Sequence, residues 1–254
     1  MKILLISDTH DNLDCVNRLA ARHDADACFH LGDLSAYTKE SVQRFPVEML
    51  LKQLQHSPHI SEEEYASLKN SGDPAAMREL AIRYRTYGNF EDYLSGGKRF
   101  EVPVYAIPGN NEDPDVISEV FQHPPVNLHL LDDSVQIELE SFVVYALGGA
   151  IGGEDGFQYV ATAARIEALR RNVTRKYSGR NLIQLTHVPP YEAPELLRLA
   201  ADLNPTLAFC GHTHHWDERV LDSGCRVMTI PKCARGHAVL ELKRNQWDIR
   251  TFSA

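Results

Sequence analysis

The amino-acid sequence predicts an α/β protein that contains at least one mixed β-sheet. Strand-like and helix-like segments alternate in the early part of the chain, and the last third is richer in strands. Residues 35–100 differ, because they hold few strand signals and several helix signals. We therefore expect one domain over residues 1–254 that carries a helical insertion at 35–100.

Ten short apolar runs are expected to form strands, because most have β-branched or aromatic residues and end at Gly, Asp, Asn or Pro. They are 2–7, 27–31, 104–107, 135–139, 142–147, 181–186, 207–210, 226–230, 237–242 and 247–251. Leu13, Val16 and Leu19 fall on one face of an expected helix, with Asp11 or Asn12 as its cap. Residues 114–121 and 161–172 are also expected to be helical.

The segment at 35–100 has the marks of several helices. Ser61 and Glu64 fit a capping box, and Asp73 followed by Pro74 fits a cap with proline at the first helical position. An apolar stripe at helical spacing follows, formed by Met77, Leu80, Tyr84 and Tyr87. The insertion either packs against the core, covers the active site or forms a homo-oligomer surface.

Composition excludes several classes of protein. The 26 Lys and Arg against 35 Asp and Glu give a net charge of −9, which makes nucleic acid an unfavourable partner because its backbone needs clustered cations. Metal ions can still supply local positive charge for a small anionic substrate. No apolar run reaches membrane-spanning length, so no membrane partner is expected. Five widely spaced cysteines and no export signal indicate reduced thiols in the cytoplasm.

Five short blocks place metal-ligating side chains directly after predicted strands. They are Asp8-Thr9-His10, Gly32-Asp33, Gly109-Asn110-Asn111-Glu112, Thr186-His187 and Gly211-His212-Thr213-His214-His215. Ligand sites gather at strand ends in α/β proteins. Residues two apart in an extended segment point the same way, so the first and last blocks can each aim two side chains at a common region. The three glycines allow sharp turns and close approach of the backbone.

The chemistry of these side chains indicates two metal ions. Carboxylates, imidazoles and one amide suit Mn, Fe, Zn or Ni, and we expect manganese first. Seven ligands are too many for one tetrahedral zinc ion but suit two ions that share a bridging carboxylate. Two such ions about 3.5–4 Å apart can clamp a phosphate and generate a hydroxide nucleophile near neutral pH.

With these blocks in this order, the chain resembles the calcineurin-like metallophosphoesterase superfamily. The pattern of that family runs D-x-H, G-D, G-N-H-[DE], a histidine after a strand, and G-H-x-H. The resemblance implies a four-layer α/β/β/α sandwich of two mixed sheets. It implies one metal ion held by Asp8, His10, Asp33 and His214. It implies a second ion held by Asp33, Asn110, His187 and His212, with Asp33 as the bridge.

One position departs from the family pattern. Asn111 stands where the family usually has the histidine that contacts phosphate and protonates the leaving group. An amide can donate a hydrogen bond but cannot deliver a proton. Losing a general acid typically costs about 10²–10⁴-fold in rate for a poor leaving group. We therefore expect Asn111 to orient the phosphate, and a leaving group that departs as a stable anion to be favoured.

Three further residues have open roles. His215 is either a substitute proton donor or an exposed histidine, and the second interpretation is favoured. Glu112 either orients a ligand such as His10 or His187, or is a solvent-facing acid at a helix N-terminus. His30 is expected to be a core or supporting histidine. The glycine-rich segment 148–156 does not match a phosphate-binding loop and is expected to be a loop near the substrate.

The sequence thus predicts a metal-dependent phosphoesterase that attacks a small phosphorylated substrate with a metal-bridging hydroxide. The missing histidine favours a phosphodiester substrate. The alternatives are a phosphomonoesterase acting on a small metabolite, with His215 or water as proton source, and a metal-binding scaffold without turnover.

Overall fold

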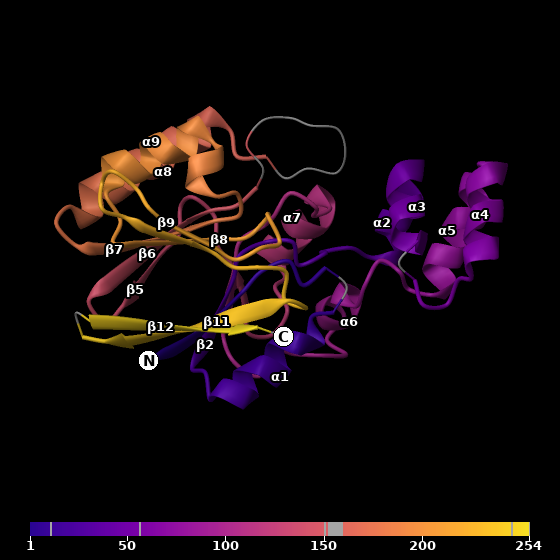
Figure 1. The fold of residues 1–254 in the computed structure, drawn as a ribbon, viewed down its shortest axis with the longest axis horizontal. Coiled ribbons are helices and arrows are strands. Elements are labelled where there is room, and N and C mark those ends of the chain that lie inside the picture. Colours follow the sequence, from indigo (N-terminus) through magenta and orange to yellow (C-terminus); the bar gives the residue numbers. More distant parts are fainter. Residues whose placement is uncertain (11, 56, 150, 152–159, 245, 254) are drawn as a thin grey trace.

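The computed structural model describes residues 1–10, 12–55, 57–149, 151, 160–244 and 246–253. Two six-stranded mixed sheets pack face to face, with helices on both outer faces (Figure 1). The expected α/β/β/α sandwich is confirmed.

The first sheet has the strand order β12-β11-β1-β2-β3-β4. Its strands are β1 (Lys2–Ile6), β2 (Ala27–His30), β3 (Val104–Ala106), β4 (Leu128–Leu130), β11 (Gly236–Lys243) and β12 (Gln246–Ser253). Strands β1 to β4 are parallel, whereas β11 pairs antiparallel with β1 and with β12. The first strand of the chain therefore lies between an early strand and a late one.

The second sheet has the order β5-β6-β7-β8-β10-β9. Its strands are β5 (Gln136–Leu139), β6 (Phe142–Leu147), β7 (Asn181–Thr186), β8 (Leu207–Cys210), β9 (Asp217–Val220) and β10 (Arg226–Thr229). The four central strands are parallel and the two edge strands are antiparallel to their neighbours.

Side chains that alternate along β1 fill two layers of the core. Ile3 and Leu5 belong to the cluster between the sheets, where they join residues such as Leu185. Leu4 and Ile6 belong to the cluster beneath the helices of the first sheet. All four are fully buried, as expected for a strand that is covered on both faces.

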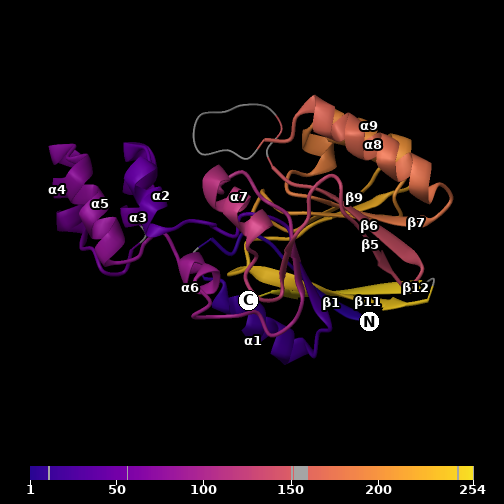
Figure 2. The same cartoon turned by 180° about the vertical axis from the view of Figure 1, so that it is seen from behind.

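Helices cover the outer faces of the sandwich (Figure 2). α1 (Asp14–His23) and α7 (Pro114–Gln122) bury Val16 and Ile117 against the first sheet. α8 (Ala163–Tyr177) and α9 (Pro194–Leu203), the latter preceded by the short helix η1 (Pro190–Glu192), bury Leu169 and Leu196 against the second. No helix in the described ranges is long and apolar enough to cross a membrane.

The insertion has a small core of its own. α2 (Lys39–Arg44), α3 (Val47–Gln55), α4 (Glu62–Ser71) and α5 (Pro74–Arg83) lie beside the sandwich (Figure 1). Phe45, Leu50 and Met77 are buried together among them. Ser61 and Asp73 cap α4 and α5 as predicted. By contrast, α6 (Phe90–Leu94) contributes its apolar side chains to the core of the sandwich.

Some predicted elements differ from the structure. Strands β4 and β9 and helix α9 were not predicted from the sequence. Asn12 is not the cap of α1: Leu13 is, without a side-chain hydrogen bond, while Asn12 Oδ1 accepts from the Asp14 N–H over 3.2 Å. Asp11, together with Ala150 and residues 152–156 of the glycine-rich segment, lies outside the described residues.

Candidate metal centre

Four of the predicted ligands form a compact group. Asp8 and His10 follow β1, Asp33 follows β2, and His214 follows β8. One potential ligand atom from each lies within 4.8 Å of the others. His214 Nε2 is 3.0 Å from Asp8 Oδ1 and 3.4 Å from His10 Nε2. The structure thus brings together the whole set that the resemblance implied for one ion.

The two oxygens of the Asp8 carboxylate have different partners. Oδ2 accepts hydrogen bonds from the Ser7 hydroxyl at 2.5 Å and the His212 N–H at 3.1 Å. Oδ1 points toward His214. Burial opposes ionisation, yet the hydrogen bonds from His214 and Ser7 and the charge of His187 hold the pKa of Asp8 well below its usual range. The sequence analysis did not predict the role of Ser7, because a serine at a strand end is common.

A second group is centred on Asn110, which follows β3. Its side-chain oxygen Oδ1 lies 2.9 Å from His187 Nε2 and 3.0 Å from His212 Nδ1. His187 follows β7 and His212 follows β8. These are the residues that the resemblance assigned to the other ion. Burial lowers the pKa of His212 and of His10, which favours the neutral imidazole that metal binding requires.

The hydrogen bonds of His187 fit a cation at this second group. Nδ1 lies 2.8 Å from the Leu31 carbonyl oxygen, an acceptor, so Nδ1 carries the proton. In the neutral ring, Nε2 then presents a lone pair toward the Asn110 oxygen, which also has only lone pairs to offer. Two acceptors aimed at each other are stabilised by a cation that both can bind.

Asp33 connects the two groups through its two oxygens. Oδ1 lies 3.5 Å from His187 Nε2, and Oδ2 lies 3.9 Å from His10 Nε2. Asn111 contacts both oxygens: its N–H donates to Oδ1 at 3.0 Å and its side-chain amide donates to Oδ2 at 2.8 Å. Asn111 therefore supports the carboxylate that joins the two groups, and its contact with phosphate stays a prediction.

The backbone conformation at the predicted ligands differs from the extended conformation that was expected from the sequence. Five of the predicted ligands have a left-handed backbone: Asp8, His10, Asp33, His212 and His214, with φ between 49° and 71°. The segments after β1 and β8 were expected to be extended, and they are not. Their side chains converge because the backbone turns sharply at each ligand. Such conformations are uncommon for residues other than glycine and concentrate at functional sites.

Glycine is required at two positions by the close approach of neighbouring segments. A Cβ atom on Gly109 would lie 2.1 Å from Asp33 Oδ1, and one on Gly211 would lie 1.8 Å from the Ser7 hydroxyl oxygen. Both distances are far below van der Waals contact. The predicted role of these glycines in close backbone packing is confirmed.

Glu112 has a role that neither sequence interpretation described. It is fully buried, and its two oxygens accept from the Leu34 N–H at 2.6 Å and the Gly109 N–H at 2.7 Å. Burial and the nearby charge of Asp33 raise its pKa well above the usual range. Glu112 therefore ties the loop after β2 to the loop after β3, and neither contacts His10 or His187 directly nor faces solvent.

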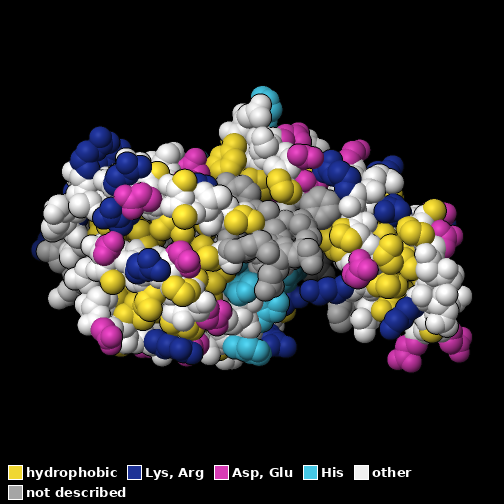
Figure 3. Space-filling model, turned by 90° about the horizontal axis from the view of Figure 1, so that it is seen from above, with side chains coloured by type: hydrophobic (Ala, Val, Ile, Leu, Met, Phe, Trp, Pro, Cys, Tyr) yellow, Lys and Arg dark blue, Asp and Glu magenta, His cyan; other side chains and the backbone are white. Residues whose placement is uncertain are grey.

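The remaining histidines lie where the favoured interpretations put them. His30 is buried in β2, where its Nε2 lies 2.9 Å from the Thr9 hydroxyl, and burial lowers its pKa to about 3. His215 is exposed and its Nδ1 lies 3.5 Å from the Arg235 guanidinium. On one face of the molecule, histidine side chains gather beside the notch between the sandwich and the insertion (Figure 3).

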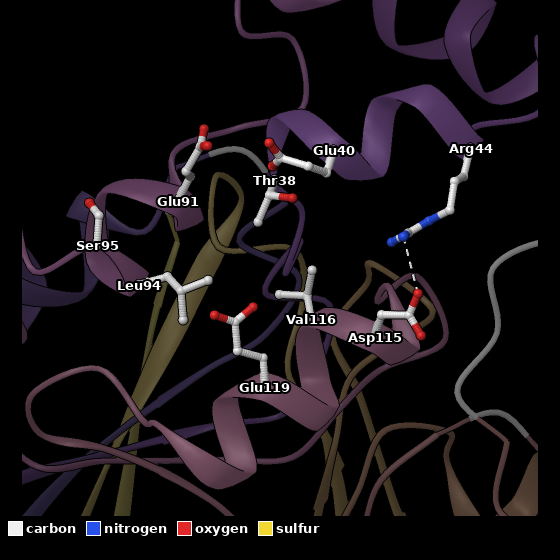
Figure 4. A pocket seen from close by; sticks show the side chains of 9 residues that line it. All are labelled: Thr38, Glu40, Arg44, Glu91, Leu94, Ser95, Asp115, Val116 and Glu119. Atoms are coloured by element: carbon white, nitrogen blue, oxygen red, sulfur yellow. Dashed lines mark ion pairs between the residues drawn. The ribbon is translucent and has the colours of Figure 1, made fainter.

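The insertion meets the sandwich at an open groove of about 440 Å³ (Figure 4). The groove lies between α2, α6 and α7, with Leu94 and Val116 among its apolar residues. Arg44 of α2 crosses to α7, where it pairs with Asp113 and lies 3.1 Å from Asp115. Because Asp113 follows Asn111 and Glu112, these contacts connect the insertion to a loop of the metal centre.

Comparisons with known proteins agree with this geometry. The family model for calcineurin-like phosphoesterases matches residues 1–216. No curated protein matches the chain.

Several solved structures have the same fold at low sequence identity. A dimetal phosphatase from Danio rerio is 10% identical with a TM-score of 0.57, and the match covers 100% of this chain and 96% of that one. GAP50, described as the anchor in the inner membrane complex of Plasmodium, is 11% identical with a TM-score of 0.52, over 100% and 84%. Another crystal structure is 16% identical with a TM-score of 0.61, over 99% of both chains.

Proposed function

The chain belongs to the calcineurin-like phosphoesterase family, a family of hydrolases, and we propose that it cleaves phosphodiesters of small molecules at a centre of two divalent metal ions. The observation that carries the proposal is the position of Asp33. One of its oxygens faces the group around His10 and the other faces the group around His187. A carboxylate so placed suits a bridge between two ions.

The seven predicted residues divide between the ions in this proposal. Asp8, His10, Asp33 and His214 hold one ion, and Asp33, Asn110, His187 and His212 hold the other. Manganese is our first choice of metal, and iron, zinc and nickel satisfy the same ligands. When bound, two such ions supply Lewis-acid binding of the phosphate and a water-derived nucleophile near neutral pH.

Neighbouring residues hold the proposed ligands in position through hydrogen bonds. Ser7 fixes the unused oxygen of Asp8, and the Leu31 carbonyl fixes the tautomer of His187. Supporting hydrogen bonds of this kind orient metal ligands and tune their basicity. Asn111 holds both oxygens of Asp33 through its backbone and its side chain.

The preference for diesters rests on what Asn111 cannot do. Its amide has no proton to give to a leaving group. Its side chain is also engaged with Asp33, and the nearest alternative in sequence, His215, is exposed beside Arg235. A substrate whose leaving group departs as a stabilised anion loses least from the missing acid.

The test compares two esters on one protein. The protein is stripped with a chelator, reloaded separately with Mn, Fe, Ni or Zn, and assayed on bis(p-nitrophenyl) phosphate and p-nitrophenyl phosphate. We expect two bound ions per chain and metal-dependent turnover that favours the diester. Turnover that favours the monoester would overturn the substrate proposal, and two bound ions without turnover of either ester would count against hydrolysis of simple phosphoesters.

A matched pair of variants controls the assay. Asp33→Asn removes a charge from the proposed bridge, so it should lose at least one ion and its turnover. Asp222→Asn makes the same change at an exposed site and should behave as the unmodified protein does.

A further inference from the structure

Two cysteines that are far apart in the sequence lie side by side. Cys15 is in the first turn of α1 and Cys233 is in the loop between β10 and β11, 218 positions later. Their sulfur atoms are 3.0 Å apart, and both thiols are free. A disulfide has an S–S distance of about 2.05 Å, so a shift of about 1 Å would join them. The other cysteines, Cys28, Cys210 and Cys225, are fully buried.

The two thiols are not equivalent. Cys233 is half-buried, whereas Cys15 is only 5% exposed. The hydrogen bond between them raises the pKa of Cys15 and lowers that of Cys233, and the charge of Arg18 favours both thiolates. Because the thiolate is the reactive form, the more exposed Cys233 is the better nucleophile. Cys15 is then in position to react with an oxidised sulfur on Cys233.

We propose that Cys15 and Cys233 are a redox modification site at which a peroxide forms a reversible disulfide. The Cys233 thiolate attacks a peroxide oxygen, which breaks the O–O bond, releases hydroxide and leaves a sulfenic acid. Cys15 then attacks that sulfur, forms the S–S bond and releases water. Overall, two thiols and one hydrogen peroxide give one disulfide and two waters. A dithiol reductant reverses the reaction.

The bridge would form next to the metal centre. The Cys233 N–H donates to the Ser7 carbonyl at 2.9 Å, and the Ser7 hydroxyl donates to Asp8. Cys15 follows the loop that carries Asp8 and His10. The disulfide would therefore fasten α1 to the β10–β11 loop at the place where both adjoin a predicted ligand. This site does not depend on the proposed phosphodiesterase activity.

Peptide mapping under non-reducing conditions tests the proposal on the full chain. After titration with hydrogen peroxide, we expect two of the five thiols to be lost, a bridge between the peptides that hold Cys15 and Cys233, and recovery with dithiothreitol. Cleavage after Arg18 and Arg22 separates Cys15 from Cys28, so the two pairings are distinguishable. A bridge to Cys28, or oxidation of Cys233 while Cys15 still reacts with an alkylating agent, would overturn the proposal.

Single variants separate the two steps. In Cys15→Ser, Cys233 should stop at the sulfenic acid, which a dimedone probe traps. In Cys233→Ser, Cys15 should stay reduced at the same peroxide concentration. The melting temperature of the unmodified protein should rise by about 5 °C on oxidation, because the bridge restrains a long loop of the unfolded chain, and neither variant should show that rise.

Discussion

The side-chain amide of Asn111 donates a hydrogen bond to Oδ2 of Asp33 over 2.8 Å. Asn111 therefore supports the carboxylate that joins the two ligand groups, at the position where the family pattern has a proton donor. Under the proposed function, the same residue holds the carboxylate between the two metal ions and restricts the leaving groups that the site can release.

Replacing this residue by the histidine of the family pattern tests that limit. Asn111→His should raise the turnover of a monoester with a poor leaving group, such as glycerol phosphate, by about tenfold or more, because an imidazole can protonate the leaving alkoxide. Bis(p-nitrophenyl) phosphate should gain less, because p-nitrophenolate departs as a stable anion. The metal content of each variant is measured beside its rate, because the Asn111 side chain also holds Asp33. Asn111→Ala is the control, since it loses the amide without adding an acid. Equal monoester rates in all three proteins would contradict the missing-acid argument.

Removing the carboxylate of Glu112 should weaken both the fold and the metal centre. Glu112→Ala leaves the N–H groups of Leu34 and Gly109 buried without their acceptor, which costs about 2–5 kcal/mol in the free energy of unfolding. Metal affinity should fall too, because Leu34 is next to Asp33 in the sequence and Gly109 is next to Asn110. Urea unfolding and metal titration measure the two effects.

Two further variants separate the role of the buried Glu112 carboxylate from the effect of removing any one negative charge. Glu112→Gln keeps one acceptor oxygen and should cost less than the alanine variant. Glu119→Ala removes an exposed carboxylate from α7 and should leave the urea midpoint within experimental error. A loss as large in Glu119→Ala would contradict the argument.

Gly109→Ala should displace the bridging carboxylate. The new Cβ would lie 2.1 Å from Asp33 Oδ1 and 2.3 Å from the Asp33 nitrogen, so the Asp33 loop has to move. Displacement of catalytic groups by about 1 Å can cost about 10²-fold in rate. We expect loss of at least one metal ion, measured by elemental analysis, and a comparable fall in kcat/KM. Gly97→Ala is the control, because its new Cβ would lie at an ordinary 3.4 Å from its nearest neighbour, and it should keep its metal ions and its kcat/KM. The prediction fails if Gly109→Ala keeps its metal ions and its kcat/KM as well.

The buried histidine His237, which lies against His23, should make the fold sensitive to mild acid. His23 and His237 have their Nε2 atoms 2.8 Å apart, and His237 is 4% exposed. Burial, followed by the charges of His23 and Arg22, lowers the pKa of His237 to about 4. The unfolded state takes up the proton near pH 6.5 and the folded state does not until about pH 4. Stability should therefore be fully present above pH 6.5 and fall progressively as pH drops toward 4.

The protein is first freed of metal with a chelator, so that bound metal does not contribute to its stability. Its urea unfolding midpoints at pH 7.5, 6 and 5 then measure how stability depends on pH. His237→Gln removes the titrating group, so its midpoint should fall less between pH 7.5 and 5 than that of the unmodified protein. The same slope in both proteins would exclude His237 as a source of the acid sensitivity.

The sequence predicted the strands that carry the ligands because buried strands have an unambiguous pattern. The apolar run 142–147 and the run 181–186 coincide with β6 and β7. The missed strands lack that pattern: β4 has three residues, and β9 is a mostly exposed edge strand of charged residues. α9 begins after Ala193 without a capping side chain, so its start has no polar signal.

Within the candidate site, residue types were predictable but backbone conformation was not. Asp8 and His10 were expected to converge through extended geometry, and they converge through left-handed turns instead. Nothing in the letters of a short loop specifies a positive φ at a non-glycine residue, because the surrounding structure imposes it. The role of Glu112 was missed for a similar reason, since its partners are backbone N–H groups of another loop.

The separation of the ligands along the chain has a consequence for biosynthesis. Asp8 and His214 meet although they are 206 positions apart, and β1 pairs with β11, which ends at Lys243. A ribosome therefore has to make the segment between them, strands β2 to β8 included, before the first predicted ligand can meet the last. Until His214 has been made, the group that contains Asp8, His10 and Asp33 lacks its fourth member. We expect the metal ions to be acquired after translation, so the cellular metal supply at that moment determines which ions the protein carries.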